Sequence, residues 1–172
     1  MDSMILIDDV RKKLDSAANS LKEEHRNRKW TYTLLFELAT LGEERGYGVC
    51  PWPETMKGGW LYDLIWYGED TTNEWPTRMT DVVLVLESEW SPYLCDIRYD
   101  FQKLIQAKSK IKVMVCRMLN EEEKTELRKD IEAFAYKDEA ETYMIVLYDA
   151  KSGLFEYWKY EWQNTDGGWR KI

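Results

Sequence analysis

Two kinds of hydrophobic periodicity alternate along the chain and predict a domain of mixed strands and helices. Apolar residues three or four positions apart indicate helices, and β-branched, aliphatic or aromatic runs indicate strands. The predicted helices are residues 1–29, Trp30–Glu44, Ser91–Ser109 and Glu121–Lys137. The predicted strands are Tyr47–Trp52, Trp60–Tyr67, Val82–Glu89, Ile111–Met118, Thr142–Tyr148 and Leu154–Trp162. The strand-helix-strand order in the middle of the chain favours an α/β fold with a mixed sheet flanked by helices.

The length of 172 residues predicts one domain, with at most one appended element. Residues 1–29 are rich in charge and carry only a weak apolar stripe, so we expect a charged helical arm there. Residues 30–172 then form the single α/β domain. No Pro- or Gly-rich linker separates the two parts.

The composition excludes several classes of protein. No apolar run is long enough to span a bilayer and no secretory signal is recognisable, so we expect a cytoplasmic protein without membrane contact. Three widely spaced cysteines argue against a disulfide framework or a zinc site. The single histidine, His25, lies among charged residues, which argues against a serine-type triad. A Gly-rich phosphate loop is also absent from the sequence.

The net charge of −8 disfavours binding to nucleic acid, but the local charge of one stretch is positive. Between Arg98 and Arg117 six basic residues face one acidic residue, Asp100. This stretch could offer a positive face to a polyanion. We expect Arg98, Lys108 and Lys110 to contact nucleic acid.

Carboxylates on two neighbouring predicted strands carry the most specific signal. Asp63 shares a strand face with apolar residues, where an ionised carboxylate is costly unless a cation pairs with it. Glu87 and Glu89 share a face of the next strand, with Cα atoms ~6.5–7 Å apart. If Asp63 lies beside Glu87, the three carboxylates converge, and a divalent cation would relieve their repulsion. Mg²⁺ prefers such hard oxygen ligands.

Each of these residues also has a structural explanation. Glu89 could simply face solvent at the strand end, and Asp63 could form a buried pair with an arginine. Glu37 lies near the edge of its helix's apolar stripe and could extend toward the sheet, although an exposed position on the helix surface is the simpler explanation. Aromatic residues around the acidic strands could stack on unpaired bases, but aromatic residues more often fill a core or an interface.

The order of these elements resembles the core of the PD-(D/E)xK, or restriction-endonuclease-like, nuclease superfamily. The resemblance covers residues 30–118. It rests on a helix with an acid, on Gly59-Trp-Leu-Tyr-Asp63, on Val82-Val-Leu-Val-Leu-Glu87-Ser-Glu89, and on the helix that follows. It implies a restriction-endonuclease-like mixed sheet flanked by helices and metal-assisted hydrolysis of phosphodiester bonds, with DNA as the expected substrate. Mg²⁺ or Mn²⁺ would be the cofactor.

The resemblance also implies roles for single residues. Asp63 and Glu87 resemble the metal-binding acids, and the Ser88 carbonyl would be a further ligand. Glu37 resembles the helical acid that holds a metal-bound water. Glu89 stands where the family usually has lysine, so it would act as a base or a second metal ligand.

Some members of that superfamily carry the lysine on the next helix, where Lys103 is the candidate here. Lys103 also belongs to a stripe with Asp96 and Asp100, which is typical of a surface ion-pair ladder. Both interpretations of Lys103 stay open at this point.

The missing motif lysine and the charge of −8 leave a second hypothesis. The chain could be a catalytically inactive nuclease fold that serves as an interaction module or as a subunit of a larger complex. The last predicted strand, Leu154–Trp162, is aromatic on both faces, and a homodimer is one way to cover it.

Overall fold

The structure is a computed structural model that describes residues 3–21, 26–52, 60–70, 78–136, 138–162 and 167–172. The helices are α1 (Ser3–Ser20), α2 (Asn27–Glu44), α3 (Leu94–Gln106) and α4 (Glu121–Ala133). The strands are β1 (Gly48–Cys50), β2 (Leu64–Asp70), β3 (Arg78–Glu89), β4 (Ile111–Arg117), β5 (Thr142–Asp149), β6 (Leu154–Glu161) and β7 (Gly168–Lys171). The Gly59 end of the first acidic motif lies outside the described residues.

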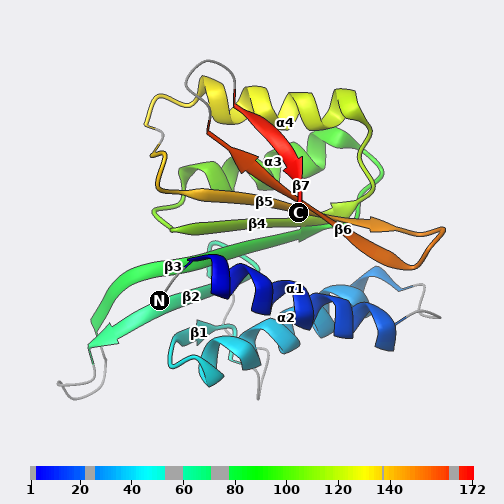
Figure 1. Cartoon of the computed structure of the whole chain (residues 1–172). Coiled ribbons are helices and arrows are strands. Elements are labelled where there is room, and N and C mark those ends of the chain that lie inside the picture. The colour runs from blue at the N-terminus through cyan, green and yellow to red at the C-terminus, as the bar shows by residue number, and fades with distance from the viewer. Residues whose placement is uncertain (1–2, 22–25, 53–59, 71–77, 137, 163–166) are drawn as a thin grey trace.

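The described strands form one mixed sheet in which the order of the strands follows the chain. Strands β3, β4 and β5 are parallel, and the remaining neighbours are antiparallel. Helices α1 and α2 cover one face of the sheet, and α3 and α4 cover the other (Figure 1). The predicted α/β class, with a mixed sheet flanked by helices, is confirmed.

Each face of the sheet has its own hydrophobic core, and β3 contributes to both. Leu84 and Leu86 pack under α1 and α2, while Val85 packs under α3 and α4. A strand that is buried on both faces carries an unbroken apolar run, which is why Val82–Glu89 stands out in the sequence. The apolar run leads directly to Glu87 near the end of β3.

Helix α1 belongs to the domain rather than to a separate arm. Its apolar stripe is buried in the same core as α2, with Val10 and Leu14 fully covered. The Tyr157 hydroxyl donates a hydrogen bond to Asp15 at 2.6 Å and so joins α1 to β6. The stripe was weak in the sequence because charged residues occupy the remaining positions of the helix.

The chain itself covers both aromatic faces of β6. Phe155 and Tyr157 lie in the core beside α1, and Tyr160 lies in the core beside α4. Trp158 receives the Lys124 ammonium over its ring at 3.6 Å. The aromatic pattern is therefore explained without a second copy, and the homodimer stays a prediction.

Several boundaries differ from the predicted ones for local reasons. Strand β2 begins at Leu64, so Asp63 precedes the strand instead of lying within it. Helix α3 begins at Leu94, because the Ser91 hydroxyl donates to Asp96 and accepts from the Tyr93 amide, in a turn before the helix. Strand β7 was missed, since four residues are too few to show a periodicity.

No helix among the described residues is long and apolar enough to cross a membrane.

A buried ion pair joins β4 to the segment before β5. The fully buried Lys112 ammonium lies 2.6 Å from Glu141, and it also donates to the Ile105 carbonyl and the Tyr143 hydroxyl. Burial lowers the pKa of Lys112, and the carboxylate of Glu141 opposes that shift. The buried Lys112 ammonium therefore needs the Glu141 carboxylate to stay charged.

We expect Glu141→Ala to lower the free energy of unfolding by about 3 kcal/mol, because it leaves the buried Lys112 cation without its counter-charge. The double variant Lys112→Met/Glu141→Ala should recover most of that loss, since no isolated charge remains. Urea unfolding measures both values, with the exposed Glu139→Ala as the matched control. A double variant that is no more stable than Glu141→Ala would contradict this account.

Candidate active site

Asp63 and Glu87 lie opposite each other where β2 begins and β3 ends. Leu64 pairs with Leu86 and Ile65 with Val85, so the antiparallel register sets Asp63 against Glu87. Ile65 and Val85 belong to the core beneath α3, and alternation along each strand directs both acids to the same face. The Ser88 amide donates a hydrogen bond to Asp63 Oδ2 at 2.8 Å and fixes that carboxylate.

The Glu87 carboxyl group is almost completely enclosed, with 2% of the residue exposed. Burial raises the pKa of Glu87 from 4.5 to about 8, with a further increase from Asp63 and a partial decrease from Lys103. Burial also raises the pKa of Asp63, although the Ser88 hydrogen bond acts in the opposite direction. Two neighbouring acids with raised pKa values, one just before β2 and one near the end of β3, are typical of functional sites.

Lys103 reaches this pair from α3. Its ammonium lies 2.5 Å from Glu87 Oε1 and 3.2 Å from Asp100 Oδ1. Burial lowers the pKa of Lys103, but Glu87 and Asp100 outweigh it and raise the pKa, so the ammonium stays charged. The contact with Glu87 is an ion pair without good hydrogen-bond geometry, because Glu87 Oε1 is buried with no hydrogen-bond partner among the described residues. Lys103 therefore joins both the ion-pair stripe of α3 and the carboxylate pair.

Two further residues beside the pair were not singled out as site residues. Burial raises the pKa of Tyr62, and the Glu87 charge raises it further. Asp100 accepts a hydrogen bond from Lys103 at 3.2 Å and raises the pKa of Asp63. Only the position of Asp100 in the stripe with Lys103 signalled a role, and nothing in the sequence signalled Tyr62.

Glu89 lies near the pair but is held by the backbone. The Ser91 amide donates to Glu89 Oε1 at 2.6 Å, and the Glu89 charge contributes to the raised pKa of Asp63. Ser88 directs its side chain away, with its hydroxyl 3.3 Å from that of Thr31 on α2. Only its backbone belongs to the acidic face.

The expected convergence of Glu37 with the two acids is wrong. Helix α2 packs on the opposite face of the sheet from α3, and the Glu37 carboxylate lies 3.8 Å from Lys13 on α1. Its position at the edge of an apolar stripe directs it between two helices. The apolar stripe of α2 shows which side of the helix is buried. It does not show which face of the sheet the helix covers.

Of the three residues expected to contact nucleic acid, Arg98 is paired with α4, and Lys108 and Lys110 lie at the other end of β3 from the acids. Arg98 makes a double hydrogen bond to Asp130 and ties α3 to α4. Lys110 pairs with Asp81 at 2.8 Å, and Lys108 is exposed near it. Asp81 precedes Glu87 by six residues of β3, which is roughly 20 Å.

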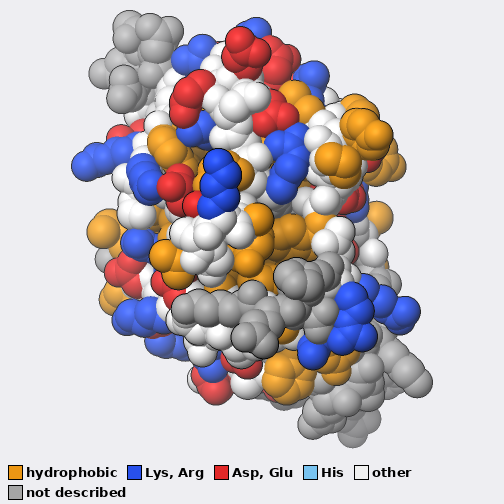
Figure 2. All heavy atoms as spheres, turned by 90° about the vertical axis from the view of Figure 1, so that its right-hand side faces the viewer, with side chains coloured by type: hydrophobic (Ala, Val, Ile, Leu, Met, Phe, Trp, Pro, Cys, Tyr) orange, Lys and Arg blue, Asp and Glu red, His pale blue; other side chains and the backbone are white. Residues whose placement is uncertain are grey.

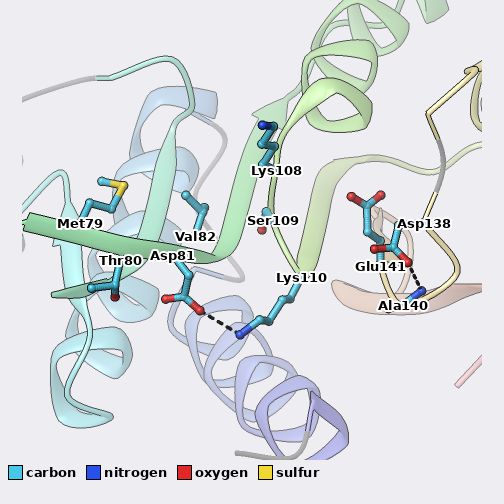
Figure 3. Close-up of a pocket in the computed structure, with 10 residues that line it drawn as sticks. All are labelled: Met79, Thr80, Asp81, Val82, Lys108, Ser109, Lys110, Asp138, Ala140 and Glu141. Carbon is cyan, nitrogen blue, oxygen red and sulfur yellow. Dashed lines mark hydrogen bonds and ion pairs between the residues drawn. The ribbon is translucent and has the colours of Figure 1, made fainter. Parts of the chain in front are cut away.

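Lys108 and Lys110 line a cavity of about 590 Å³ at the N-terminal ends of the parallel strands (Figure 3). Its wall also contains Asp81, Asp138 and Glu141, so acidic groups balance the lysines. The cavity therefore lies at the opposite end of β3 from Asp63 and Glu87 and contributes nothing to their site.

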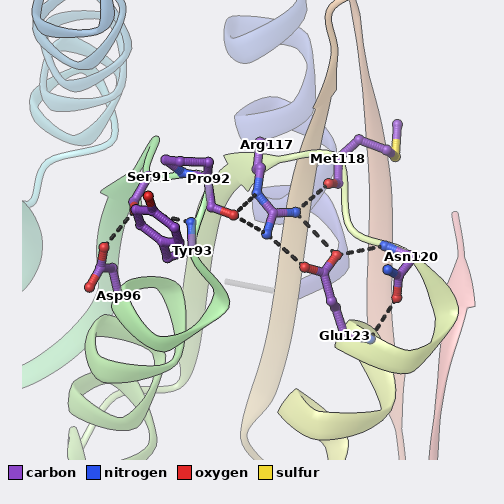
Figure 4. A network of polar contacts seen from close by, with 8 residues as sticks. All are labelled: Ser91, Pro92, Tyr93, Asp96, Arg117, Met118, Asn120 and Glu123. Atoms are coloured by element: carbon purple, nitrogen blue, oxygen red, sulfur yellow. Dashed lines mark hydrogen bonds and ion pairs between the residues drawn. The ribbon is translucent and has the colours of Figure 1, made fainter.

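A polar network fixes the loop that leads from β3 into α3 (Figure 4). The Arg117 guanidinium donates to the Pro92 carbonyl at 2.8 Å and binds both oxygens of Glu123, at 2.6 and 3.1 Å. Glu123 in turn forms a capping box with Asn120 at the start of α4. The network holds the start of α3, and so the position of Lys103, relative to the end of β3.

The side chains at this site suit Mg²⁺ or a similar ion, which needs only one or two ligands from the protein. The described residues contain no group of three or more His, Cys, Asp or Glu side chains that could hold a metal. Asp63 and Glu87 provide two carboxylates, and Mg²⁺ commonly binds through one or two carboxylates with water and substrate phosphate. Glu87 Oε1 lies 2.5 Å from the Lys103 ammonium, so a metal ion bound at Glu87 would share the carboxylate with that cation.

No family model, curated protein or solved structure matches this chain. The geometry of the site therefore carries the functional argument.

The raised pKa of Glu87 predicts a pH-dependent stability. Its folded-state pKa of about 8 lies above 4.5, so the stability it contributes is complete below about pH 4.5 and is lost as pH rises through about 8. Glu87→Gln cannot ionise and lacks this loss. We expect the variant to exceed the wild type by about 1–3 kcal/mol in unfolding free energy at pH 9, with a smaller difference toward pH 5.

Urea unfolding at several pH values between 5 and 9 measures this difference, with Glu139→Gln as the exposed control. A difference between Glu87→Gln and the wild type that does not change with pH would contradict the assigned pKa.

Proposed function

We propose that the protein is a metal-dependent nuclease that hydrolyses phosphodiester bonds, with DNA as the expected substrate. One observation carries the proposal: Asp63 and Glu87 lie in register at the end of β3, with the Lys103 ammonium 2.5 Å from Glu87. Two acids and one cation on a single face are the groups that metal-assisted phosphodiester hydrolysis uses.

Lys103 would supply the positive charge that the motif lysine normally provides, because Glu89 occupies the position of that lysine. Its ammonium approaches from α3 instead of from the strand, and Asp100 orients it. A charged donor at this position can stabilise negative charge that develops on a phosphate during attack by water.

Asp63 and Glu87 are the residues that would hold Mg²⁺ or Mn²⁺, and the ion would polarise the phosphate and lower the pKa of the attacking water. The Ser88 amide keeps Asp63 oriented for this task. Glu89 has one oxygen engaged by the Ser91 amide, and its other oxygen is the candidate acceptor for a proton of that water. A cation bound at Glu87 would also favour ionisation of its carboxyl group.

One observation favours the second candidate function, an inactive interaction module. The Lys103 ammonium lies 2.5 Å from Glu87 and 3.2 Å from Asp100, so these groups also form a structural ion-pair cluster of a kind that needs no metal ion. The two functions differ in one respect that can be measured, because only the nuclease requires metal for an activity.

The test is cleavage of labelled single-stranded DNA, duplex DNA and RNA of one sequence in Mg²⁺, Mn²⁺ or EDTA. We expect cleavage of at least one of them with metal and none in EDTA. No cleavage of any substrate by the wild type with either metal would overturn the nuclease proposal and favour the interaction module.

A further inference from the structure

We propose that an exposed basic and aromatic surface on the first turns of α2 binds single-stranded nucleic acid at the end of the sheet where the acids lie. The surface consists of Arg26, Arg28, Lys29, Tyr32 and Phe36. The inference rests on the proposed function for the identity of the ligand, and it names the form of the substrate that the function leaves open.

The surface combines a hollow with two stacked rings. Arg26, Arg28, Lys29 and Tyr32 line a hollow of about 270 Å³. Tyr32 is 53% exposed, and its ring lies parallel to that of Phe36, with 6.4 Å between centroids and 7° between planes. A planar base can stack on such an exposed aromatic ring.

The charge of this surface is opposite to that of the whole chain. Three of the four residues 26–29 are cations, and the first turn of α2 contains no acidic residue, although the net charge is −8. The local charge of this surface is complementary to a phosphate backbone.

The surface lies at the same end of the sheet as the candidate active site. Thr31, next to Tyr32, contacts Ser88 at 3.3 Å and accepts a hydrogen bond from Trp90 Nε1 at 2.9 Å. Ser88 is next to Glu87, and consecutive Cα atoms are about 3.8 Å apart. In Figure 1 the start of α2 and the end of β3 lie on the same side of the molecule.

Figure 2 views that side and shows a band of hydrophobic side chains with basic side chains at its margins. A single strand can present both backbone phosphates and unpaired bases to such a surface. A duplex hides its bases, so the stacked rings would have no partner. The arrangement therefore favours single-stranded nucleic acid over a duplex.

Fluorescence anisotropy in EDTA tests the proposal, with a labelled dT20 oligomer and its duplex with dA20 as probes. We expect the wild type to bind dT20 at least tenfold more tightly than the duplex. Tyr32→Ala should weaken dT20 binding about tenfold, and Tyr32→Phe should retain it because the ring remains. Arg28→Gln should reduce the slope of log Kd against log salt concentration by about 0.7.

The matched controls are Tyr136→Ala, an 88% exposed aromatic residue elsewhere, and Lys108→Gln, an exposed lysine at the other end of β3. Both should bind dT20 within twofold of the wild type. Equal binding of dT20 by Tyr32→Ala and the wild type, or tighter binding of the duplex, would overturn the inference. If the wild type cleaves nucleic acid but Tyr32→Ala binds dT20 normally, only the binding surface on α2 is refuted. If dT20 binding depends on Tyr32 but the wild type cleaves nothing, the binding surface is supported and the proposed nuclease function is refuted.

Discussion

Glu87→Gln is expected to reduce metal-dependent cleavage at least about 10³-fold while the protein stays folded. Glutamine keeps the volume of the side chain but removes the carboxylate that would hold the metal. The enclosed position of Glu87 leaves little room for a replacement ligand, because only 2% of the residue is exposed. Since burial opposes ionisation of Glu87, the loss of its charge should not unfold the domain.

The measurement is the single-turnover cleavage rate at saturating Mn²⁺ on the preferred substrate. Glu37→Gln is the matched control, because it removes an acid of the same type from the opposite face of the sheet. Its rate should stay within about twofold of the wild type. A Glu87→Gln protein that cleaves at the wild-type rate would refute the role of Glu87.

Lys103→Met is expected to lower kcat about 10²–10³-fold with little change in KM, because its charge acts on the transition state more than on the bound substrate. Methionine retains much of the length of the side chain and removes its charge. A lysine that served only the ion-pair stripe with Asp100 would leave kcat unchanged, since exposed pairs of that kind contribute little to stability. Kinetics of the wild type and Lys103→Met, with Lys108→Met as control, separate the two roles.

The strand that ends at Glu87 could be predicted because it follows from a local pattern, an unbroken apolar run. The meeting of Asp63 and Glu87 could be stated only as a condition, because the pairing of β2 with β3 and its register are set by tertiary contacts. The helix that follows β3 was equally clear from its stripe of Ile97, Phe101 and Leu104.

Longer-range features could not be predicted in the same way. The face of the sheet that α2 covers depends on the packing of α1 beside it, so Glu37 was assigned to the wrong side. The partners of Arg98 and Lys110 come from residues 29 or more positions away in the chain, so their charges looked free in the sequence. Lys103 was ambiguous for a related reason, because its stripe faces both Asp100 and the end of β3.

The proposed function requires Asp63 and Glu87 to form one metal site, and calorimetric titration with Mn²⁺ measures whether they do. The titration compares the wild type, Asp63→Asn, Glu87→Gln and the control Glu37→Gln, each with a short phosphorothioate oligonucleotide that supplies phosphate ligands. We expect the wild type and Glu37→Gln to bind Mn²⁺ and both site variants to lose that binding. Absence of binding by the wild type, or binding that survives both site substitutions, would refute a shared metal site.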